Sequence, residues 1–419
     1  MNFAKRLRPY WLRIMLLLSV IGPGIITANV DNDAGGISTY SVAGAHYGYG
    51  LLWMMPLVAI ALIIVQEMSA RLGVFTGKGL ADLLRESMGV RVTAAILSLL
   101  VFVNLANTVS EFAGVAASLE IFGVSKYISV PIAAILVWLL ITRGNYESIE
   151  KVFLVASAIF LAYVVSGVLA KPDWGEVGGA LVSPSFQWNA GYITIFVTII
   201  GTTIAPWMQF YQQSSIVDKG IKPAYYRLER IDVVVGSLFA VFVAAFIMIA
   251  CAATLYKNGI AINSAEDAAV ALAPLAGKYA SILFAIGLLN ASLFASAILP
   301  LSTAYTVSEA FGWESSLSRN FREAPIFFTI FTSFIVIGAL IVLLPIKSLI
   351  QAMIFSQTMN GVLLPVILVV MLILINNKRI MGKHVNGRAS NLLAGATVAI
   401  LIILAAILVV TTFFPGLLK

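Results

Sequence analysis

The chain has 419 residues, of which 60% are hydrophobic and only 11% are charged, and its mean hydropathy is +0.99. Soluble domains carry about 25% charged residues, so this composition excludes a soluble globular protein and indicates a polytopic membrane protein. The net charge of +7 does not indicate nucleic-acid binding, because the basic residues are spread over six separate segments. The single cysteine, Cys251, excludes an intrachain disulfide.

Hydrophobic runs long enough to cross a bilayer, about 20 residues each, occur at about eleven places. They lie near residues 14–34, 48–70, 90–121, 128–142, 149–170, 189–213, 231–255, 279–309, 325–345, 348–375 and 392–414. No small-residue cleavage site precedes the polar region of the first run, so we predict a retained span and not a signal peptide. We therefore expect an all-α polytopic membrane protein with a single transmembrane transporter domain over residues 1–419.

The distribution of Lys and Arg predicts the orientation of these spans. With the N-terminus in the cytoplasm, 20 of the 26 Lys and Arg residues fall in cytoplasmic segments. Basic residues concentrate on the cytoplasmic side of membrane proteins, and a miscount by one span would destroy the bias. We predict a multi-pass protein of the inner (plasma) membrane with a cytoplasmic N-terminus and an external C-terminus.

The first run carries an unusual polar stretch at residues 22–36, which contains Asp31, Asp33, one proline and four glycines. A carboxylate at bilayer depth costs about 2.5–3.5 kcal/mol on insertion scales, so it persists where it faces a cavity, a partner or a ligand. Glycine and proline nearby favour an interrupted helix whose free backbone carbonyls can bind a ligand. The stretch predicts a cation site at Asp33.

The sixth run repeats this interruption, with Gly201 and Pro206 in mid-membrane and a run of glutamines and serines after them. Two interrupted helices five spans apart are the pattern of a five-plus-five inverted repeat with its site at the midplane. The repeats would span residues 14–170 and 189–375, and residues 392–414 would form an eleventh helix. The alternative is two ordinary helices that are kinked by proline.

Several motifs together resemble the natural resistance-associated macrophage protein (NRAMP) family of divalent-metal transporters over essentially the whole chain. They are Gly22-Pro23-Gly24, Asp33-Ala34-Gly35-Gly36, the stretch from Gln66 to Lys78, Ala205-Pro206-Trp207, and Ser356-Gln357 with Leu364-Pro365. The resemblance implies a leucine-transporter-type fold with broken helices 1 and 6. It also implies a divalent cation bound by Asp33, by the residue at position 205, by a backbone carbonyl near Thr202, and by Gln357 on closure.

Two departures from the family pattern change the expected ion. Ala205 stands where the family has a methionine whose thioether favours manganese and iron, and Gly36 replaces a ligating asparagine. The remaining donors are hard oxygens, which suit magnesium because it keeps several waters and binds through one or two carboxylates. This pattern resembles the NRAMP-related magnesium transporter branch. Asp31 would hold the water shell of the ion, attract cations at the mouth of the site, or bond the broken backbone.

Proton coupling is the other departure from the family. Trp207, Gln212 and Thr108 occupy the positions of the family's histidines and helix-three acid, and none of the three titrates near neutrality. We therefore expect transport without proton coupling. Glu111 remains as an acid in the third span, either with a proton role or as a structural group that hydrogen-bonds Asn104 or Asn107.

The sequence thus predicts uptake of a divalent cation, most favourably partly hydrated magnesium, by alternating access. One alternative is a proton-coupled manganese or iron transporter of the parent family, and another is a sodium-coupled organic-solute symporter on the same fold. No nucleophile–base constellation, phosphate-binding glycine loop or cluster of Cys and His supports an enzyme. We expect no cofactor and no nucleic-acid partner; the partners are the transported ion and the lipid bilayer, and a monomer is compatible with the sequence.

Overall fold

The structure is a computed structural model of the chain, and it describes residues 27, 30–144, 151–152, 155, 157–345 and 347–413. The motif Gly22-Pro23-Gly24 and most of the first hydrophobic run lie outside the described residues. The described part contains helices and no strand. Its α-helices are α3 Ala34–Tyr47, α4 Met54–Thr76, α5 Leu80–Glu120, α6 Lys126–Arg143, α8 Leu161–Leu169, α9 Trp174–Val182, α10 Ala190–Thr203, α11 Pro206–Asp218, α12 Tyr226–Thr254, α13 Ala265–Ala269, α14 Ala273–Ala276, α15 Ala280–Phe311, α16 Pro325–Leu343, α17 Leu349–Asn376, α18 Lys378–Met381 and α19 Arg388–Phe413.

Within the described residues, nine helical segments are long and apolar enough to cross a membrane, and they confirm the expected all-α membrane protein. These segments are Met54–Thr76, Leu80–Glu120, Lys126–Arg143, Ala190–Asp218, Pro223–Asn258, Ala265–Phe311, Pro325–Leu343, Leu349–Asn376 and Arg388–Val410. They correspond to nine of the predicted runs. The first and fifth runs are only partly described, and the fifth contributes the shorter apolar helix Ala158–Leu169.

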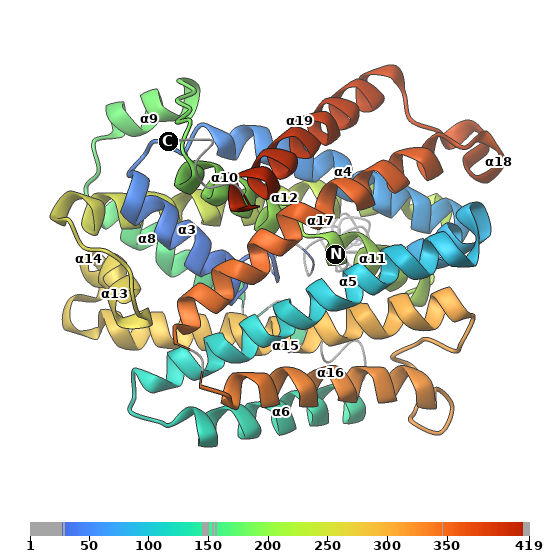
Figure 1. Cartoon of the computed structure of the whole chain (residues 1–419), viewed down its shortest axis with the longest axis horizontal. Helices are drawn as coiled ribbons and strands as arrows, with labels where there is room; N and C mark the ends of the chain where they lie inside the picture. The colour runs from blue at the N-terminus through green and yellow to red at the C-terminus, as the bar shows by residue number, and fades with distance from the viewer. Residues whose placement is uncertain are drawn as a thin grey trace, which may run out of the picture.

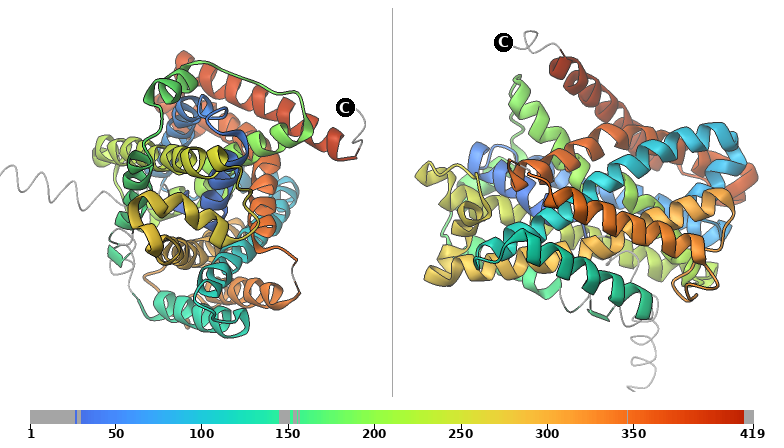
Figure 2. Two further views of the ribbon diagram at one scale, coloured as in Figure 1. Left: turned by 90° about the vertical axis from the view of Figure 1, so that its left-hand side faces the viewer. Right: turned by 60° about the horizontal axis from the view of Figure 1, so that its bottom comes forward.

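The long helices form a bundle in which α5 packs against both α15 and α17 (Figure 1). Helices α6 and α19 lie at opposite margins of this bundle, as Figure 2 also shows. Helix α3 lies inside and packs against α12, α17 and α10. The bundle therefore surrounds the start of α3, which directly follows the two aspartates of the polar stretch.

The predicted interruption of the sixth run is present between α10 and α11. Ile204 (φ −122°, ψ 57°) and Ala205 (φ −65°, ψ 139°) leave the helical conformation after Thr203. Pro206 then occupies the first position of α11, where its missing N–H would have had no partner within the helix. The carbonyls of the last turn of α10 are thereby left without partners inside the helix.

Close backbone packing fixes α10 against α17. A Cβ atom on Gly201 would lie 2.6 Å from the Cα of Gly361, and a Cβ on Gly361 would lie 2.5 Å from the carbonyl oxygen of Val197. Small residues at such contacts allow membrane helices to approach closely. Because Gln357 lies one turn before Gly361, this contact also brings its side chain to the interrupted segment.

Hydrogen bonds to neighbouring helices hold α11. The Ser69 hydroxyl of α4 donates to the carbonyl oxygen of Gln209 at 2.7 Å. The Ser302 hydroxyl of α15 donates to the carbonyl oxygen of Trp207 at 3.1 Å. The interrupted helix is thus held on both sides of the break, by α17 before it and by α4 and α15 after it.

Candidate metal site

Asp33 is positioned by the start of α3. Its backbone is extended (φ −68°, ψ −177°), and its carboxylate caps the helix by accepting a hydrogen bond from the Gly36 N–H at 2.6 Å. Aspartate favours this position, and its negative charge is stabilised at a helix N-terminus. The side chain is buried, with 4% of the residue exposed. Asp33 is therefore a buried carboxylate with a fixed orientation.

The missing side chain of Gly36 allows three oxygens to converge. Around the position that a Cβ on Gly36 would take, the carbonyl oxygen of Asp31 lies at 2.5 Å, and Asp33 Oδ1 and Thr202 Oγ1 both lie at 3.3 Å. These oxygens come from the polar stretch before α3 and from the last turn of α10. A hydrogen bond of 2.8 Å between Tyr40 and Thr203 joins the same two helices. The oxygens surround one point, and no side chain at position 36 enters it.

Two of the residues that contribute these oxygens, Asp31 and Thr202, carry buried side-chain acceptors without a partner among the described residues. Both carboxylate oxygens of Asp31 and the hydroxyl of Thr202 form no hydrogen bond within the described part of the chain. Asp31 is 2% exposed and Thr202 is 3% exposed. Buried acceptors without partners are costly. A cation at this point would supply the missing positive charge, so the donor set fits a metal ion.

Gln357 and Ala205 complete the set of predicted site residues. Gln357 of α17 reaches Asp33 and donates Nε2 to its two carboxylate oxygens at 3.4 and 3.3 Å. Ala205 contributes no side-chain donor, and its carbonyl oxygen already accepts from the Met208 N–H at 3.1 Å and from Gln209 Nε2 at 3.4 Å. The structure therefore brings Asp31, Asp33, Gly36, Thr202 and Gln357 together, while Ala205 lies in the adjacent break without a free oxygen.

One of the two alternatives for Glu111, a structural carboxylate that accepts a hydrogen bond from Asn104 or Asn107, is wrong. Glu111 Oε2 accepts from the Ala34 N–H at 3.2 Å, whereas Asn104 donates to Thr303 at 2.9 Å and Asn107 donates to Asn360 at 2.9 Å. The first N–H groups of α3 have no acceptor within the helix, so the Ala34 N–H donates to the Glu111 carboxylate. Partners on other helices have displaced the neighbours on α5. Glu111 consequently lies against the residue that follows Asp33.

Sequence reasoning did not single out Asn360. Its Nδ2 donates to Gln357 Oε1 at 2.7 Å and to Asn107 Oδ1 at 3.2 Å, and the residue is buried. The available signal was an asparagine one helical turn after Gln357 in an otherwise apolar run, since polar residues inside membranes usually have partners. Asn360 connects the candidate site to α5.

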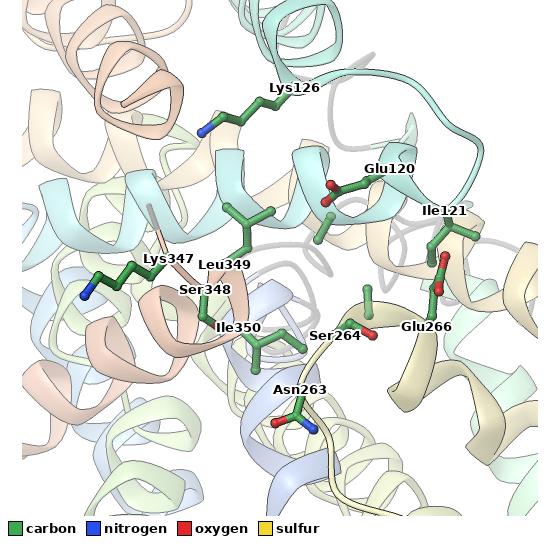
Figure 3. Close-up of a pocket in the computed structure, with 12 residues that line it drawn as sticks. Glu120, Ile121, Lys126, Asn263, Ser264, Glu266, Lys347, Ser348, Leu349 and Ile350 are labelled. Atoms are coloured by element: carbon green, nitrogen blue, oxygen red, sulfur yellow. The ribbon is translucent and has the colours of Figure 1, made fainter. Parts of the chain in front are cut away.

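A pocket of about 460 Å³ opens where the ends of α5 and α17 approach α13 (Figure 3). Its lining carries both signs of charge, with Glu120, Glu266, Lys126 and Lys347, and it includes none of the six predicted site residues. In the described segments, no group of three or more His, Cys, Asp and Glu side chains forms a metal cluster. The candidate site is thus the enclosed point between α3, α10 and α17, away from the open pocket.

Comparisons with known proteins agree with this architecture. A "Divalent metal cation transporter MntH" from Bacillus subtilis (strain 168) is 28% identical over 410 residues, which cover 95% of this chain and 93% of that protein. Its namesake from Yersinia pestis (strain Pestoides F) is 27% identical over 406 residues, 94% of this chain and 95% of that protein. Both relatives therefore align with nearly the full chain.

Solved structures confirm the predicted leucine-transporter-type fold. The crystal structure of a manganese transporter from Eremococcus coleocola, in complex with an aromatic bis-isothiourea substituted compound, matches with a TM-score of 0.78 at 23% identity, covering 96% of this chain and 89% of that one. Mhp1, a nucleobase-cation-symport-1 family transporter in a closed conformation, matches with a TM-score of 0.62 at 17% identity, covering 94% and 91%.

The family model described as "Natural resistance-associated macrophage protein-like" matches residues 24–411, from the first predicted span to the last described helix. The chain therefore belongs to the natural resistance-associated macrophage protein-like (Nramp) family.

Proposed function

We propose that this protein moves divalent metal cations across the membrane by alternating access, with the ion bound at Asp33 between α3 and α10. The observation that carries this proposal is the convergence of the Asp31, Asp33 and Thr202 oxygens on one buried point. The C-terminal end of α10 adds the negative end of a helix dipole to the same region. Family membership and the names of the two MntH relatives support transport over an enzymatic role.

The comparisons support manganese as the ion better than they support magnesium. The structural neighbour from Eremococcus coleocola is a manganese transporter, and the relatives from Bacillus subtilis and Yersinia pestis are divalent metal cation transporters. These likenesses extend over nearly the whole chain. They favour the alternative in which this protein, like its parent family, carries manganese.

The donor set at the site is the argument for magnesium. The side-chain atoms that converge at the site, Asp33 Oδ1 and Thr202 Oγ1, are hard oxygen ligands, and position 205 holds a methyl group without sulfur. Manganese and iron sites in the family gain from a soft thioether, whereas magnesium binds through one or two carboxylates and retained waters. Magnesium is therefore a second candidate ion, and it rests on the residues that would contact the ion.

Purified protein in liposomes tests the site. Asp33→Ala is expected to abolish uptake of the transported ion, because it removes the one carboxylate that caps α3 and faces the converging oxygens. Glu314→Ala removes an exposed carboxylate and is the matched control, with uptake expected at the native rate. Native uptake by Asp33→Ala would place the ion elsewhere in the protein.

The same liposomes separate the two ions with magnesium- and manganese-sensitive dyes. Manganese uptake that persists in a large excess of magnesium would select manganese. Magnesium uptake that a large excess of manganese does not abolish would select magnesium. Uptake of neither ion would contradict the proposed function and would favour the sodium-coupled symporter.

A further inference from the structure

Gln357 presents the wrong atom to the candidate site for ion binding. Its Nε2 group points at Asp33, at 3.4 and 3.3 Å from the two carboxylate oxygens, and its Oε1 accepts from Asn360 Nδ2 at 2.7 Å. An amide NH₂ group is a donor and cannot ligate a cation, whereas the amide oxygen can. To ligate an ion beside Asp33, the Gln357 amide must turn over, and Asn360 would then face it with a donor instead of an acceptor.

Asn360 cannot turn alone, because it forms a reciprocal pair with Asn107. Asn360 Nδ2 donates to Asn107 Oδ1 at 3.2 Å, and Asn107 Nδ2 donates to Asn360 Oδ1 at 2.9 Å. All three amides are at most 1% exposed, so water does not replace a lost partner cheaply. If Asn360 turned alone, two donors would meet on one side of the pair and two acceptors on the other. If both asparagines turn, every hydrogen bond is kept with its direction reversed.

We propose that Asn360 and Asn107 are positioning residues that form an amide relay and set which end of Gln357 faces the ion site. This inference rests on the proposed divalent-metal function. Without an ion, the relay holds Gln357 Nε2 against Asp33, which satisfies the carboxylate. With an ion, all three amides turn together, so that Gln357 Oε1 ligates the ion and Gln357 Nε2 donates to Asn360. Ion binding at α3 and α10 is thereby transmitted along α17 to α5.

The relay is tested by a carboxylate at position 360. The aspartate side chain of the Asn360→Asp variant only accepts hydrogen bonds when ionised, so Gln357 must donate Nε2 to it and keep Oε1 toward the site. Asn107→Asp adds the same charge at the next position of the relay without fixing the direction of Gln357, and is the matched control. We expect calorimetry at alkaline pH to show about tenfold tighter binding of the transported ion to Asn360→Asp than to Asn107→Asp, which is about 1.4 kcal/mol.

A Gln357→Leu background separates the relay from a simple effect of charge. In that background, Asn360→Asp should bind the ion no more tightly than Asn107→Asp, because the Gln357 amide that the relay orients is absent. The relay would be overturned if both substitutions changed the ion affinity equally in the native background. It would also be overturned if Asn360→Asp still bound the ion more tightly than Asn107→Asp in the Gln357→Leu background. Manganese and magnesium are both titrated into the native protein first. Binding of neither ion would refute the proposed function, and the relay, which requires an ion to turn the three amides, would be refuted with it.

Infrared difference spectra test the relay in proteins that retain Asn360 and Gln357. Addition of the ion to the native protein should change side-chain amide bands, because three amides reverse their hydrogen bonds. Asn107→Leu should remove part of that change while leaving Gln357 in place. A difference spectrum that is identical in the native protein and in Asn107→Leu would overturn the relay.

Discussion

At the scale of single residues, Ala205 offers a direct test of ion choice. The residue lies in the break between α10 and α11, is 2% exposed, and contributes only a methyl group. Ala205→Met would introduce a thioether, a soft ligand that favours manganese over magnesium. We expect the ratio of manganese to magnesium uptake to rise about tenfold in this variant, as measured in liposomes with both ions present.

Ala205→Leu is the control for that prediction, because leucine has about the size of methionine and lacks sulfur. If both variants shift the ratio equally, the change comes from a narrower space beside Thr202 and not from a ligand. If neither variant shifts it, position 205 does not set selectivity. The burial of Ala205 makes some loss of stability expected in both, so the ratio of the two uptake rates is the informative quantity.

The residues of the site could be predicted where their side chains have a high free energy in the hydrocarbon region of the bilayer. Asp31 and Asp33 stand out in the sequence because a carboxylate at bilayer depth requires a reason. The partners of Glu111 and of Asn107 were not predictable, because each is supplied by a segment more than 70 residues away in the sequence. Spacing along one helix indicates a shared face, but it does not say which neighbouring helix offers the better hydrogen-bond partner.

At the scale of elements, the packing of α10 on α17 is where the interrupted helix is most tightly fitted. Gly361 lies opposite Val197, whose carbonyl oxygen leaves no room for a Cβ. Gly361→Ala should therefore separate the two helices and cost about 1–3 kcal/mol of stability, although alanine is the better helix former. We expect a lower melting temperature and weaker ion binding, since Gln357 moves with α17.

Gly395→Ala is the matched control for Gly361→Ala, because it is a helical glycine in α19 with open space at the Cβ position. That substitution should leave the melting temperature unchanged or raise it slightly. A similar fall in melting temperature in both variants would mean that these helices need glycine whatever its contacts. An unchanged melting temperature in Gly361→Ala would mean that α10 and α17 can move apart without loss of stability.

The elements themselves were predicted best where hydropathy alone defines them. The run near residues 279–309 matches α15, Ala280–Phe311, within two residues at each end. The run near residues 90–121 locates only part of α5, which begins at Leu80 and continues through a kink at Gly89 with φ 79°. The residues before this kink form a separate helical segment with charged side chains, so a search for apolar runs omits them.

At the scale of the whole molecule, the positions of the ionisable groups bear on whether protons or the membrane potential drive transport. Trp207, Gln212 and Thr108, which the resemblance predicts to stand at the family's proton-handling positions, are all buried. Glu111 Oε2 is engaged by the Ala34 N–H at the start of α3. The orientation of the termini stays a prediction from the Lys and Arg distribution. An inside-negative potential would then drive a divalent cation toward the cytoplasm.

The membrane potential is sufficient to drive uptake of a divalent cation without proton coupling. It contributes about 2.3 kcal/mol per charge per 100 mV, so about 4.6 kcal/mol for a divalent ion, which corresponds to roughly a 2,000-fold concentration ratio. We expect uptake into liposomes to rise with an inside-negative potassium diffusion potential and to leave the lumenal pH unchanged. Glu111→Gln should likewise show no lumenal pH change while metal enters. Lumenal acidification during metal entry into liposomes with the native protein, lost in Glu111→Gln, would instead identify Glu111 as a proton carrier and the protein as a proton-coupled transporter.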